Sequence, residues 1–157
     1  MLDIHRGFWK VGTFPRWVMV SIQAFVIYQA LARGLDYIGA QPTNPNSGLV
    51  RAESAAPFGL GLSFWGFVFV GATAIFLIGF TFRWWSWITA AHVIIAVSYF
   101  AVTYGLFLTA FENVSWQGIR TPSGLFVAML IHGVMAAGTA ALARQSSIRR
   151  GELRGDI

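Results

Sequence analysis

The longest apolar run of this 157-residue chain begins at Trp84 and ends at Phe111, and it contains no charged side chain. A helix rises about 1.5 Å per residue, so roughly 20 residues cross a hydrocarbon core about 30 Å thick. Arg83 and a group of tryptophans mark one end of the run, and Glu112 marks the other, as expected at the two interfaces of a bilayer. The pattern predicts a transmembrane helix.

Three further apolar segments have polar, glycine-rich or proline-containing flanks, which predicts a span in each. Only Arg83 separates the second span from the third, so these two must form a tight hairpin. The sequence therefore predicts an all-α integral membrane protein with four transmembrane helices, arranged as two antiparallel hairpins. The predicted spans cover residues 17–32, 62–82, 84–111 and 125–143. Outside them lie an N-terminal interfacial segment (1–14), outer loops at 34–61 and 112–124, and a tail at 144–157.

The N-terminal segment mixes charged residues with Phe8 and Trp9, which is typical of a segment lying at headgroup depth. A disordered leader is the alternative. The first span also has features of a signal peptide, including the small-residue pattern Ala30-Leu31-Ala32. Its two glutamines make a poor signal core, so we expect the span to be retained.

Composition supports the membrane class. The chain is 56% hydrophobic and 11% charged, whereas soluble domains carry about 25% charged residues. The formal charge of +5 comes from basic residues at the ends of the spans, where anionic lipid and insertion topology explain them. We therefore expect the lipid bilayer as a partner and no nucleic acid. The absence of cysteine excludes disulfides and thiolate-ligated metals.

The distribution of Lys and Arg predicts the orientation in the membrane. Eight lie on the side of the N-terminus, the Arg83 turn and the tail, and three lie on the other side. The positive-inside rule then places both termini in the cytoplasm of a multi-pass plasma-membrane protein.

Polar side chains within the spans fall on shared helix faces, and such faces are expected to contact protein and not lipid. In the first span, Tyr28 and Gln29 follow Ser21 by seven and eight residues, which places the three on one face. In the third span, His92, Tyr99 and Thr103 follow the spacing i, i+7 and i+11, and the fourth span contributes His132. These seven residues are the candidate intramembrane polar positions.

An ionisable residue inside a span is a candidate for proton movement or gating. Counted from the span midpoints at Ser98 and Val134, His92 and His132 lie at depths that differ by about 12 Å. This offset predicts that they share neither a haem iron nor another metal, and no cofactor is expected. The alternative to a functional role is a neutral histidine hydrogen-bonded between helices.

Other chemistry is sparse. The chain has no P-loop, nucleophile elbow, zinc motif or paired intramembrane carboxylates, so we expect a protein that is not an enzyme. The outer loops contain Arg51, Glu53, Glu112 and Arg120, which are candidates for an interaction surface or for local ion pairs.

Small residues recur every four positions in the fourth span, at Gly133, Ala137 and Ala141, a spacing that lets helices approach closely. We therefore expect the first, third and fourth spans to form the packed centre, with the second facing lipid or a partner. Arg16-Trp17 recurs as Arg83-Trp84, which leaves an internal duplication open.

Short motifs point toward a family. Arg16-Trp17, Arg51-Ala52-Glu53 with Pro57, Arg120-Thr121-Pro122 and His132 together resemble small four-span membrane proteins of actinobacteria and their phages. This resemblance implies a holin-like or lysis-associated membrane protein that forms homo-oligomers or binds a membrane-protein partner. The 28-residue outer loop is long for a holin. An accessory or assembly subunit of a larger membrane complex, and a small channel or transporter, are the alternative functions.

Overall fold

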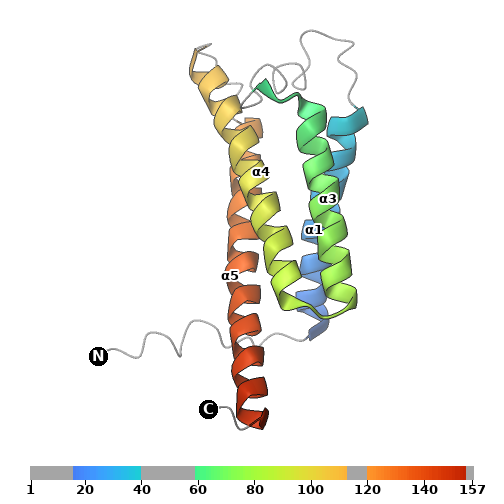
Figure 1. The fold of residues 1–157 in the computed structure, drawn as a ribbon. Helices are drawn as coiled ribbons and strands as arrows, with labels where there is room; N and C mark the ends of the chain where they lie inside the picture. Colours follow the sequence, from blue (N-terminus) through green and yellow to red (C-terminus); the bar gives the residue numbers. More distant parts are fainter. Residues whose placement is uncertain (1–15, 40–58, 113–119, 155–157) are drawn as a thin grey trace, which may run out of the picture.

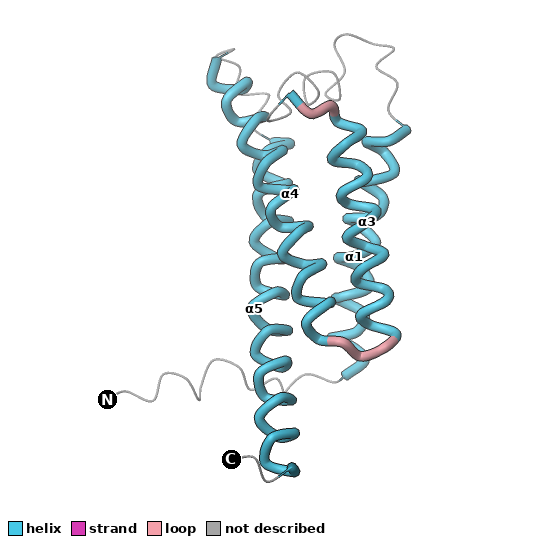
Figure 2. Tube along the Cα trace, in the orientation of Figure 1, coloured by secondary structure: helices cyan, strands magenta, loops and turns pink. Residues whose placement is uncertain are grey.

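The computed structural model describes residues 16–39, 59–112 and 120–154. These residues form four helices: α1 (Arg16–Gly39), α3 (Leu62–Thr81), α4 (Trp85–Glu112) and α5 (Arg120–Arg154), drawn in Figures 1 and 2. The all-helical prediction is confirmed for this part of the chain. The predicted N-terminal interfacial segment lies outside it.

Three stretches are long and apolar enough to cross a membrane: Leu62–Thr81, Trp85–Leu108 and Pro122–Ile148, within the ranges that the structure describes. They coincide with the second, third and fourth predicted spans. α1 is a regular helix of 24 residues but is not among the three, and its two glutamines, Arg33 and Asp36 lower its apolar character.

The helices pack in chain order, with α1 against α3, α3 against α4, and α4 against α5 (Figure 1). α3 and α4 are thus the central helices. Of the apolar window of α3, 44% is buried, compared with 22% for α5. The prediction that the second span is the most lipid-facing is therefore wrong. Its many small and aromatic residues are compatible with either environment, because lipid tails and a protein interior are equally apolar.

Two glycines set the contact between α1 and α3. A Cβ atom on Gly34 would lie 2.9 Å from the Cβ of Phe69, and one on Gly66 would lie 2.8 Å from the carbonyl oxygen of Gly34. Only glycine allows the two backbones this close. The contact explains why α1 continues to Gly39, past the predicted start of the outer loop at residue 34: Tyr37 is buried against the same surface.

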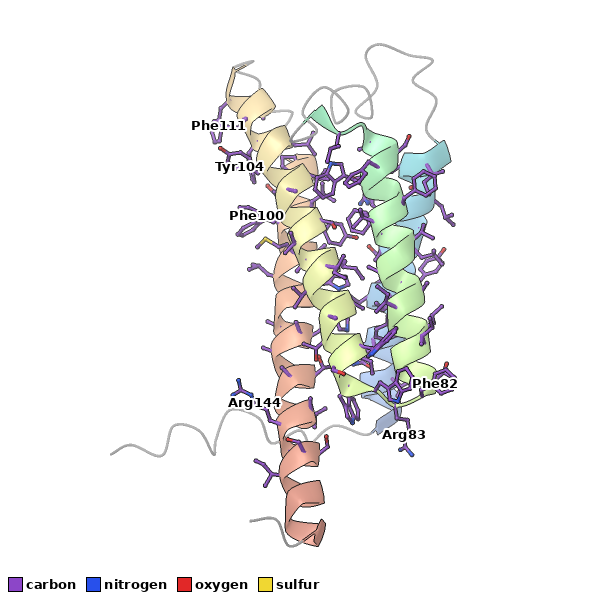
Figure 3. All side chains as sticks on the ribbon, in the orientation of Figure 1. Phe82, Arg83, Phe100, Tyr104, Phe111 and Arg144 are labelled. Atoms are coloured by element: carbon purple, nitrogen blue, oxygen red, sulfur yellow. The ribbon has the colours of Figure 1, made fainter. Side chains whose placement is uncertain are left out.

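The turn between α3 and α4 closes with two hydrogen bonds, from Trp84 N–H to the Gly79 oxygen (2.8 Å) and from Arg83 N–H to the Phe80 oxygen (3.3 Å). This is a Schellman motif with Arg83 at the left-handed position, φ 58°. Phe82, Trp84 and Trp87 are exposed around it: Phe82 stacks on Trp84, and the ring of Trp84 contacts that of Trp87 at a tilt. Figure 3 shows Arg83 and Arg144 at the same end of the bundle.

Candidate functional site: a buried histidine pair between α4 and α5

His92 of α4 and His132 of α5 contact each other in the interior of the bundle. Their Nδ1 atoms lie 3.0 Å apart, and the side chains are 0% and 1% exposed. At this distance one Nδ1 carries the proton and donates it to the lone pair of the other. The structure thus contains a histidine–histidine hydrogen bond between helices.

The axial offset expected between these histidines is wrong. That expectation placed the midpoints of the two apolar runs, Ser98 and Val134, at one level. In the structure, His132 lies opposite His92, which puts Val134 about 12 Å nearer the Arg83 end than Ser98. α5 is displaced along its axis, and its C-terminal part projects beyond the other helices (Figure 1).

A hydrogen bond between Thr89 and Thr139 fixes the same register. The two Oγ1 atoms are 2.9 Å apart, and Thr139 also lies 3.0 Å from the Met135 oxygen of its own helix. Neither threonine is among the predicted polar positions. Their signal in the sequence is weak, because a threonine within a span usually bonds to its own helix backbone.

Aromatic rings surround the pair. Phe76 of α3 meets His92 edge to face at 5.4 Å, and Tyr99 lies 5.7 Å from the ring of His132. Beyond it, the positive charge of Arg33 on α1 lies near the phenol groups of Tyr99 and Tyr37. Tyr99 therefore stands between Arg33 and the ring of His132.

A crevice of about 90 Å³ adjoins His132 at the meeting of α1, α4 and α5. Its polar lining comes from Gln29, Tyr99 and His132, and apolar residues including Phe25 and Ala128 complete it. His92 is deeper: its Nε2 atom is buried and has no hydrogen-bond partner.

The other candidate positions are dispersed. Thr103 is buried on the face shared by His92 and Tyr99. Ser21 and Tyr28 are exposed, Tyr28 to 65%, so the polar face predicted for the first span is not buried within the chain at these two residues. Gln29 is also exposed, but at the mouth of the crevice.

The four outer-loop candidates do not form a described site. Arg51 and Glu53 lie outside the described residues, Glu112 is the last residue of α4, and Arg120 is the first residue of α5. No group of three or more potential metal ligands gathers among the residues that the structure describes.

A second feature that the sequence did not reveal is an apolar groove of about 280 Å³ between α1 and α3. Ile27 and Tyr28 line one wall, and Thr73, Phe76 and Leu77 line the other. The groove needs two helices in register, which no local pattern specifies.

Comparison with protein-family models, with curated proteins and with solved structures finds no match. The class of the protein therefore follows from its own structure. It is a helical membrane protein, in which three apolar helices and a less apolar one, α1, enclose a buried histidine pair.

Proposed function

We propose that this chain is a non-enzymatic, multi-pass protein of the plasma membrane that acts by lateral self-association, in the manner of holin-like lysis proteins. In this proposal α1 is the fourth span, the spans form two antiparallel hairpins, and both termini are cytoplasmic. The resemblance to small four-span membrane proteins of actinobacteria and their phages supports the same function.

The exposed face of α5 carries this proposal. Gly133, Ala137 and Ala141 recur every four residues and are all exposed, and a Cβ atom on Gly133 would meet nothing within 4 Å. A row of small residues that the bundle itself does not use permits close approach by another helix. We call these three residues the α5 small face.

The low burial of α5 within the chain also supports association through this helix. It is the least buried of the three apolar helices, and Val127, Leu130 and Val134 are each about half exposed beside the small face. Lipid alone satisfies such a surface, but van der Waals packing between small-residue faces favours helix association in a bilayer.

Disulfide cross-linking tests this function directly, because the chain contains no cysteine. Ala137→Cys should give a dimer under oxidising conditions in native membranes. Ala90→Cys is the matched control. Ala90 is also an exposed alanine, and it lies near the same level because its neighbour Thr89 bonds to Thr139. Equal cross-linking at both positions, or none at either, would contradict the proposal.

The alternative is an accessory subunit of a larger membrane complex that binds another protein through the α5 small face. The same experiment separates the two functions by mass. A homodimer supports self-association, whereas a cross-linked product containing a different chain supports the accessory subunit.

A further inference from the structure

We propose that the His92–His132 pair is a proton-binding site, entered through the crevice beside His132, and that an added proton loosens the contact between α4 and α5. The inference is independent of lateral association, because the pair lies within one chain.

The surroundings of the two Nε2 atoms decide which histidine donates. If His132 donated from Nδ1, neutral His92 would carry its proton on Nε2, which is buried with no partner. An orphaned buried N–H group is costly and rare, whereas a bare acceptor is tolerated more easily. His92 Nδ1–H therefore donates to His132 Nδ1, and neutral His132 carries its own proton on Nε2.

The crevice provides the route. His132 lines it together with Gln29 and Tyr99, and these side chains offer donors and acceptors to water. A site needs about 10–15 Å³ to hold a water molecule, together with two to four polar partners. A volume of about 90 Å³ meets this requirement. The crevice thus brings water, and with it protons, to the histidine that the bundle otherwise encloses.

The neutral pair has one free lone pair, on His92 Nε2, and His92 does not line the crevice. A proton that enters through the crevice can therefore bind only at His132 Nδ1, and only when the hydrogen bond from His92 Nδ1–H opens. His132 then carries protons on both nitrogens, while His92 keeps its proton on Nδ1. This state has a positive charge in the apolar interior and two Nδ1–H groups face to face, so it has lost the hydrogen bond between the helices. The added proton therefore weakens the α4–α5 interface.

Among the described residues around the pair, no acidic side chain compensates the positive charge of the protonated histidine. α3 presents Phe76, α4 presents the neutral phenol of Tyr99, and α1 reaches Tyr99 through the cation Arg33. The described part of α5 adds no titratable side chain to this surface other than His132. The folded state must then bind fewer protons than the unfolded state, and stability falls as the pH falls through the range where an ordinary imidazole titrates, near 6.5.

Thermal unfolding of the detergent-solubilised protein at pH 8 and pH 5 tests the site. We expect the Tm of the wild type to fall by about 5 °C or more. The reference is His92→Asn with His132→Asn, because an Asn amide places a donor or acceptor near the Nδ1 position without titrating. Its Tm should change much less. Since all other acids and bases are shared, equal changes in both proteins would overturn the proposal.

A second measurement does not require the double variant to fold. The chain has three histidines, His5, His92 and His132, so ¹⁵N-histidine NMR resolves few signals. We expect one Nδ1–H and one Nε2–H tautomer in the pair at pH 8, and exchange of the Nε2–H proton with solvent slowed at least tenfold by Ala128→Leu, which fills the crevice. Ala90→Leu, at an exposed site, is the control. Two identical tautomers, or exchange unchanged by Ala128→Leu, would contradict the proposed proton entry.

Discussion

Thr89 and Thr139 lie on facing surfaces of α4 and α5 with their hydroxyl oxygens 2.9 Å apart, about one helical turn along α4 and two turns along α5 from the His92–His132 contact. The two contacts pair donors with acceptors at only one axial position of α5. They therefore fix the register of the most extensively packed helix pair in the bundle.

Thr139→Val should destabilise the protein by about 1 kcal/mol, the usual scale of an interhelical hydrogen bond in a membrane protein. The hydroxyl of Thr139 accepts the hydrogen bond from Thr89. Valine removes this hydroxyl and keeps the shape of the side chain. Thr81→Val is the control, since Thr81 is exposed and bonds only to Leu77 of its own helix among the contacts seen. Denaturation in one detergent gives both values, and equal effects would contradict the assigned role of Thr139.

Gly66→Ala should damage folding, because the new methyl group would lie 2.8 Å from the Gly34 oxygen. Backbone shifts that relieve such overpacking cost about 1–3 kcal/mol. Gly71→Ala on the same helix meets nothing within 4 Å, and it should stabilise the helix by roughly 0.5–1 kcal/mol. The yield of monodisperse protein and its Tm compare the two variants. Tolerance of Gly66→Ala would show that α1 and α3 are farther apart than described.

Arg83 occupies a backbone conformation that costs a non-glycine residue about 1 kcal/mol. Arg83→Gly should therefore be more stable than Arg83→Ala by about this amount, although both lose the charge. The comparison isolates backbone strain from electrostatics, and equal stabilities would place Arg83 outside the left-handed region. The retention of arginine where glycine fits better is consistent with a need for positive charge at this end of the bundle.

The proposed orientation predicts the labelling of single cysteines in intact cells. Cysteine at Ser47, in the predicted outer loop, should react with an impermeant reagent, and cysteine at Ser147 should not. Ser147 is exposed near the end of α5 that lies on the Arg83 side. Labelling at Ser147 alone would reverse the topology.

The sequence predicted what local periodicity encodes. Runs of about 20 apolar residues located α3, α4 and α5, and helical spacing placed His92, Tyr99 and Thr103 on one buried face. It did not predict which helices touch. A valine facing lipid and a valine facing protein give the same pattern. The sequence therefore predicts that α3 faces lipid or a partner, whereas in the structure Val70 of α3 packs against Gly34.

The same limit applies to the site. The depth of His132 depends on the axial position of α5, which Thr139 and the histidines set through side chains distant in sequence. For the same reason Ala137, expected in the packed centre, is exposed, while its neighbour Ala136 is buried. From the sequence alone, Val70→Leu is expected to be tolerated, because a lipid-facing site adapts to a larger side chain. In the structure Val70 lies against Gly34, so the larger side chain should crowd α1.

The proposed function depends most on whether the protein acts on the membrane by assembling through α5. Membrane potential, followed with a fluorescent dye after induced expression, measures this directly. We predict an abrupt collapse with the wild type and with Ala90→Leu, and a delayed or absent collapse with Ala137→Leu, because leucine fills the α5 small face. A potential that stays steady in all three, at equal amounts of protein in the membrane, would contradict the holin-like function.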